Sequence, residues 1–146
     1  MRLPMNITSL INKEIKIEQM DGHLFQRVVY DFARKVNGKV NDWFPPSYPL
    51  NYFCIDIEIG DTVVSILLHE FFPYAAIASY INEFQIQFLD YKNLMLELNP
   101  YYTVLGAAFL NEHFNPNIHD LSDSELKIVR HWRPNTNGEI IFNFWN

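Results

Sequence analysis

The alternation of apolar and polar residues is strongest over residues 52–69, which read YFCIDIEIGDTVVSILLH. Apolar side chains recur at every second position up to Gly60-Asp61, a pair that supplies the positive φ angles of a two-residue turn. This turn sets the register, with Ile59 opposite Thr62. The pattern predicts a β-hairpin with one mixed face and one apolar face, the latter formed by Phe53, Ile55, Ile57, Val64, Ile66 and Leu68.

A helical period replaces this alternation over residues 21–36, where apolar residues recur at helical spacing and polar residues face away. Asp21 can cap the start of such a helix, and Gly38 supplies the stop. The segment therefore predicts an amphipathic helix that covers a sheet. Residues 7–19 are ambiguous: Ser9 could cap a short helix that ends at Lys16, whereas Ile15, Ile17 and Gln19 would suit an edge strand, and we predict the helix.

Residues 39–50 (KVNDWFPPSYPL) contain three prolines and predict a loop, because proline disfavours both a long helix and a central strand. This loop also carries Trp43, Phe44 and Tyr48. Their rings either fold back to cap an open end of the core or form an exposed recognition surface. The second interpretation rests on the small entropy that aromatic side chains on a stiff loop lose when they bind.

The remainder of the chain predicts two more strands and then helices. A strand is expected over residues 74–80, where a helix is also possible, and another over 84–88. Helices are expected over 90–98, 101–111, 121–133 and 137–145, and Ser122 with Glu125 forms a capping box at the start of the third. The last helix is apolar almost all round and leaves only Asn143 for water. Such a helix is either buried on several sides or lies against a partner, and the second case predicts a homodimer through this helix.

These elements predict one α+β domain over residues 1–146. Its antiparallel β-meander of three to four strands would pack against the N-terminal amphipathic helix and the C-terminal helices. A chain of this length is large enough for a sizeable core and too short for two ordinary domains.

Charge and composition indicate which partners and which cellular compartment the chain suits. The chain has 17 acidic and 11 basic residues and a net charge of -6, which disfavours nucleic acid and attracts basic partners. The single cysteine, Cys54, allows no intramolecular disulfide, so a reducing compartment is expected. We find no secretory leader and no apolar run long enough to cross a membrane, and we predict a cytoplasmic protein without a membrane partner.

Candidate chemistry gathers on the mixed face of the predicted hairpin, where Asp56 and Glu58 lie near Ser65 and His69. Two carboxylates at this spacing could share a proton or a cation, although a solvated sheet face is the simpler interpretation. Ser65 and His69 lie about 13 Å apart at the rise of a strand, which excludes a nucleophilic triad.

A second group of polar residues matches no known ligand spacing. It comprises Glu112, His113, His119 and Asp120, with His131 further along the chain. The glycines form no phosphate-binding motif, and Cys54 has no adjacent base to activate it. We therefore predict no catalytic residue, no metal site and no cofactor.

The final residues, RPNTNGEIIFNFWN, resemble a C-terminal pattern of small uncharacterised bacterial proteins. In that pattern a basic residue and proline precede Thr, Gly-Glu, apolar pairs and a closing aromatic-Trp. In size, acidity and aromatic content the chain also resembles the immunity proteins that neutralise polymorphic toxins in bacteria. This resemblance implies an intracellular inhibitor without chemistry of its own, whose partner is a toxin domain, often a basic nuclease. The resemblance assigns a functional role to no individual residue of this chain.

From these observations we predict a non-catalytic cytoplasmic protein-binding domain, an immunity or inhibitor protein for a bacterial toxin. The expected contacts are Trp43, Phe44, Asp56, Glu58 and His69. The alternative prediction is a small hydrolase or ligand-binding domain, with Asp56, Glu58 and His69 around a pocket.

Overall fold

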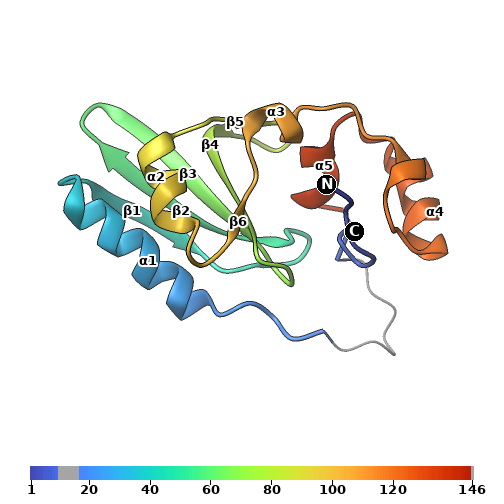
Figure 1. The fold of residues 1–146 in the computed structure, drawn as a ribbon, viewed down its shortest axis with the longest axis horizontal. Coiled ribbons are helices and arrows are strands. Elements are labelled where there is room, and N and C mark those ends of the chain that lie inside the picture. Colours follow the sequence, from blue (N-terminus) through green and yellow to red (C-terminus); the bar gives the residue numbers. More distant parts are fainter. Residues whose placement is uncertain (10–16, 146) are drawn as a thin grey trace.

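The computed structural model describes residues 1–9 and 17–145, and Figure 1 shows their arrangement. The predicted short helix over residues 9–16 lies almost wholly outside the described residues. The sheet consists of β1 (Lys39–Phe44), β2 (Tyr52–Ile59), β3 (Thr62–His69), β4 (Tyr74–Ile81), β5 (Ile86–Phe88) and β6 (Thr103–Val104). The helices are α1 (Gly22–Lys35), α2 (Lys92–Leu98), α3 (Ala107–Leu110), the 3-10 turn η1 (Pro116–Ile118), α4 (Asp123–Trp132) and α5 (Asn137–Ile141).

The antiparallel meander and the α+β class are confirmed, with more strands than predicted. Strands β1 to β5 lie in chain order, each antiparallel to its neighbour, and β6 adds a parallel pairing to β4. The β2–β3 hairpin has the predicted register throughout, from Tyr52 opposite His69 to Ile59 opposite Thr62. Its turn places Gly60 at a φ of 60°, which explains the glycine at this position.

The predicted loop over residues 39–50 is wrong in its first half, because residues 39–44 form the edge strand β1. The pairing with β2 shifts between Val40 and Asp42, so Asn41 is an extra residue in this strand. This bulge breaks the period-two pattern by which the strand would have been recognised. The prolines begin at Pro45, directly after the strand ends, which is compatible with an edge position.

Helix α1 covers one face of the sheet, as predicted, and α2 lies beside it (Figure 1). The Asp21 carboxylate accepts hydrogen bonds from the amides of His23 and Leu24, which confirms the predicted cap. The left-handed residue after the helix is Asn37, with a φ of 54°, rather than Gly38. Gly38 is needed instead for a close approach, since a Cβ there would lie 3.1 Å from the carbonyl oxygen of Glu58.

A second layer packs on the opposite face of the sheet, at the end where β2 begins and β3 ends. It contains α5 and the residues that follow it. The helix in this region is shorter than predicted, and the residues are more buried than predicted. Asn143 is 2% exposed, whereas Phe144 is 41% exposed, so the prediction that only Asn143 faces water is wrong. Asn143 is satisfied inside the protein because its side chain donates to the carbonyl oxygens of Thr8 and Ile140.

The predicted helix over residues 101–111 is also corrected. Its first part is β6, and only Ala107–Leu110 is helical. The amides of Thr103 and Leu105 donate to the carbonyl oxygens of Pro73 and Ala75, so pairing with β4 takes the place of helical hydrogen bonds.

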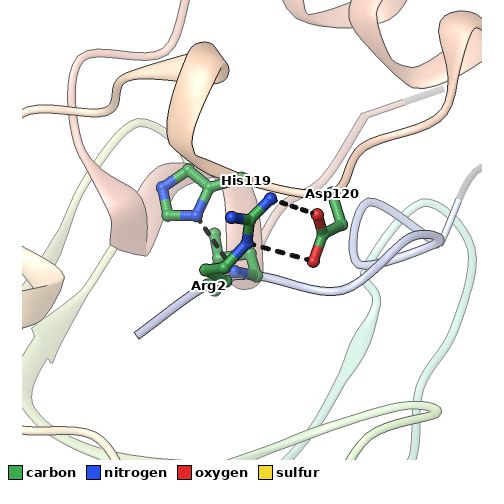
Figure 2. Close-up of polar contacts among 4 residues, drawn as sticks. Arg2, His119 and Asp120 are labelled. Carbon is green, nitrogen blue, oxygen red and sulfur yellow. Dashed lines mark hydrogen bonds and ion pairs between the residues drawn. The ribbon is translucent and has the colours of Figure 1, made fainter.

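The N-terminal segment, residues 1–9, is fixed against the end of the chain. Arg2 forms an ion pair with Asp120, and the Leu3 amide donates to His119 Nδ1 at 2.9 Å (Figure 2). Leu3 and Ile7 are fully buried. The second layer is therefore assembled from both ends of the chain, which lie close together in Figure 1.

Glu125 is the main polar anchor of the N-terminal segment. The predicted capping box of α4 is present, with Ser122 and Glu125 each accepting a hydrogen bond from the other's backbone amide. The Glu125 carboxylate is only 1% exposed and also accepts from the Asn6 amide (2.7 Å), the Thr8 amide (3.0 Å) and the Thr8 hydroxyl (2.7 Å). One side chain thus both starts a helix and holds the N-terminal segment.

We expect Gly138→Ala to lower the free energy of unfolding by about 1 to 3 kcal/mol, because it overpacks the core. The added Cβ would lie 2.4 Å from the Phe88 ring and 3.1 Å from the Leu110 carbonyl oxygen, and the backbone oxygen cannot easily move away. Urea denaturation measures the change. The matched control is Gly60→Asn, at a turn with nothing within 4 Å of the added Cβ, and it should cost less than Gly138→Ala.

Candidate functional site

The mixed face of the hairpin divides into a covered end and an open end. Tyr52, Cys54, Leu67 and His69 lie under the second layer. The open end continues onto β1, since Asp42 pairs with Asp56 and Phe44 pairs with Cys54. We call this open end the acidic face; its residues are Lys39, Asp42, Phe44, Asp56, Glu58, Val63 and Ser65. Its three carboxylates outnumber the single lysine, which lies opposite Glu58.

The carboxylates of the acidic face are placed by the register of β1 and β2. Asp42 is exposed and lies directly opposite the half-buried Asp56, and Glu58 follows two residues along β2. Like charges opposite each other on neighbouring strands repel and destabilise a sheet. The Asp42–Asp56 pair therefore opposes the stability of the sheet at this point.

Ser65 and Cys54 support Asp56 rather than forming a nucleophilic site. The Ser65 hydroxyl donates to Asp56 Oδ1 at 2.6 Å, and the Cys54 thiol lies 3.6 Å from the same oxygen. Burial, reinforced by the Asp56 charge, raises the pKa of the Cys54 thiol far above its usual value. The thiol stays protonated and is a poor nucleophile.

The aromatic residues of segment 39–50 divide between the core and the surface. Trp43 points to the α1 face of the sheet. Its ring stacks on that of Phe53, with the ring centroids 5.8 Å apart, and packs against that of Phe25, with the centroids 6.4 Å apart. Phe44 and Tyr48 are 50% and 77% exposed. The core-capping interpretation thus holds for Trp43, and the exposed-surface interpretation describes the position of Phe44 and Tyr48.

His69 is a structural residue under the second layer and does not join Asp56. Its Nδ1 accepts from the amides of Phe71 (3.0 Å) and Phe72 (3.2 Å), so the proton must be on Nε2, which donates to the Ile7 carbonyl at 2.7 Å. Burial lowers the pKa of His69 to about 4, so the ring is neutral at pH 7. Its fully buried position differs from that of the exposed binding contact predicted for it.

Two members of the polar group around residues 112–120, His119 and Asp120, make structural contacts. His119 stacks on Phe114 at 5.3 Å, and burial, reinforced by the N-terminal amino group and Arg2, lowers its pKa. Its Nδ1 is occupied by the Leu3 amide, as Figure 2 shows. Within residues 1–9 and 17–145, no three His, Cys, Asp or Glu side chains are grouped so that they could hold a metal ion.

A cavity of about 630 Å³ was not predicted from the sequence. It lies between the β4–β5 connection and the residues from the end of α4 to Trp145, so segments about 50 residues apart form its walls. Tyr52 also lines it, and burial raises the pKa of this phenol to about 12. The dense aromatic residues near the C-terminus are the one sequence signal for this cavity.

The structure defines the chain as an α+β domain whose sheet has one fully covered face and one half-covered face. Comparisons with family models, with curated proteins and with solved structures found no match for the chain. Among the described residues, no helix is both long and apolar enough to cross a membrane.

Proposed function

We propose that this chain is a non-catalytic protein-binding domain of the bacterial cytoplasm, an immunity or inhibitor protein whose partner is a basic toxin domain. The acidic face is the observation that carries the proposal. It presents three carboxylates and an exposed aromatic ring on a rigid sheet that neither layer covers.

The chemistry of the acidic face suits a basic protein. Asp42, Asp56 and Glu58 would speed association with a positively charged surface, and the net charge of -6 acts in the same direction. Phe44 offers apolar area at the rim of the same face. A carboxylate pair that costs stability in the free protein can recover that cost when a cation lies between the two groups.

The alternative of a small hydrolase or ligand-binding domain needs Asp56, Glu58 and His69 around one pocket. His69 is instead buried under the second layer and bonded to the backbone on both ring nitrogens. The geometry therefore favours the binding function. Self-association through the C-terminal segment stays a prediction, although Ile140, Ile141 and Phe142 already pack inside the chain.

Charge variants test the proposal against the product of the neighbouring gene. We expect Asp42→Lys combined with Glu58→Gln to weaken binding by roughly tenfold or more, mainly through the association rate. Surface plasmon resonance at low and high salt gives both rate constants. The effect should be smaller at high salt because exposed charges are screened.

The control changes net charge by the same amount elsewhere. Glu18→Lys combined with Glu112→Gln alters two exposed carboxylates outside the acidic face and should leave the association rate nearly unchanged. Equal losses in both double variants would mean that only total charge matters and would contradict a role for the acidic face. Failure of the parent chain to bind at micromolar concentration would remove this partner altogether.

A further inference from the structure

The cavity of about 630 Å³ is a second feature of the molecule, separate from the acidic face. Its volume is in the range of sites that bind small molecules. Trp132, Phe142, Phe144 and Trp145 form one side, and Phe84, at the β4–β5 turn, stands 85% exposed at the other. Most of the lining is therefore aromatic or aliphatic.

The charged groups of this cavity all have one sign. Glu83 and Glu139 are the charged residues that line it; Arg133, although next to Trp132 in the chain, is not part of the lining. In the part of the chain that the structure describes, neither carboxylate lies within 4.0 Å of a Lys, Arg or His nitrogen. Glu139 accepts a hydrogen bond from the Asn135 amide through one oxygen, at 2.6 Å.

The aromatic rings reinforce the preference for positive charge. The Trp132 and Trp145 rings lie nearly parallel, 6.0 Å apart, and the Phe144 ring meets Trp132 edge to face at the same distance. These contacts fix the orientation of the rings before any ligand arrives. The π face of a tryptophan attracts cations, and the attraction grows where water is excluded.

We propose that this cavity binds a small organic cation, an ammonium or guanidinium group on an apolar stem. The Trp132 and Phe144 rings contact the stem, and Glu83 and Glu139 lie around the charge. An anionic ligand would face two carboxylates without a compensating cation in the lining. This site is separate from the acidic face and does not rest on the function proposed above.

Phenethylammonium and its neutral isostere 2-phenylethanol are suitable probes of the intact chain. Tryptophan fluorescence reports binding, since Trp132 and Trp145 line the cavity and Trp43 lies elsewhere. We expect the cation to bind roughly tenfold more tightly than the alcohol at low salt, from cation–π attraction and two partly screened carboxylates. Equal affinities, or no binding of either probe, would overturn the proposal.

Charge variants test whether Glu83 and Glu139 cause the preference for the cation over the alcohol. Glu83→Gln combined with Glu139→Gln should lower the affinity for phenethylammonium several-fold and leave the alcohol unaffected, so that only the part of the preference that comes from cation–π attraction stays. The control, Asp42→Asn combined with Glu58→Gln, removes as much charge from the acidic face and should keep the preference; an equal loss there would overturn the site. Tighter binding of N-acetyl-phenylalanyl-arginine amide than of phenethylammonium would overturn the small-molecule assignment in favour of a peptide side chain.

Discussion

Glu125→Ala is expected to lower the free energy of unfolding by about 3 to 5 kcal/mol, the largest effect of any single change considered for this chain. The substitution leaves the amides of Asn6 and Thr8 and the Thr8 hydroxyl without their acceptor, and Thr8 is fully buried. Such a loss is a large fraction of the stability of an ordinary domain. Urea denaturation at neutral pH measures it.

Glu139 provides a matched control, because it occupies the same position in α5, three residues after a capping Thr136. It is exposed, and its carboxylate accepts from one amide only among the described residues. Glu139→Ala should therefore cost about 1 kcal/mol. Amide hydrogen exchange adds a local test: Asn6 and Thr8 should exchange faster in Glu125→Ala and not in Glu139→Ala. Equal costs and unchanged exchange would show that Glu125 does not hold the N-terminal segment.

His69 is expected to make the protein less stable as the pH falls from 7 to 4.5. Its pKa is about 4 in the folded protein against an ordinary value of 6.5, so in this range the unfolded chain binds a proton that the folded chain does not. The free energy of unfolding that neutral His69 contributes is fully present above pH 6.5 and is lost as the pH falls towards 4. The loss by pH 4.5 amounts to about 2 to 3 kcal/mol.

The comparison with His69→Gln isolates this contribution. The variant should be less stable than the parent at pH 7, because it gives up bonds to the backbone around it, and the difference should shrink as the solution is acidified. His23→Gln, on the exposed side of α1, should keep the pH dependence of the parent. Parallel curves for the parent and His69→Gln, measured by denaturation at several pH values, would refute the assignment.

The parts of the fold that the sequence predicts are those set by local rules. The β2–β3 register follows from one two-residue turn and an unbroken period of two. The Asp21 cap of α1 and the Ser122–Glu125 capping box of α4 each join residues at most three positions apart. The edge strand β1 was missed because the bulge at Asn41 places Val40 and Trp43, three residues apart, on the same face.

The site residues were harder to predict because burial depends on segments far away in the chain. His69 lies on a predicted strand face, but Ile7 and the C-terminal layer cover it. Asn143 was predicted to face water, and it is buried because Asn51 and Thr8 satisfy it across 92 and 135 residues. Asp56 and Glu58 are half-buried, because among residues 1–9 and 17–145 no such segment covers their end of the sheet.

The anchoring of the N-terminal segment has a consequence for synthesis on the ribosome. Leu3 and Thr8 are made before their partners His119 and Glu125, which follow 116 and 117 residues later. At ordinary translation rates this delay is about 6 to 25 seconds. During that interval Leu3 and Ile7 have no apolar layer to enter, and the β2–β3 hairpin can already pair. Leu3 and Ile7 thus reach their final places only after residues 119–125 have emerged, long after the β2–β3 hairpin can pair.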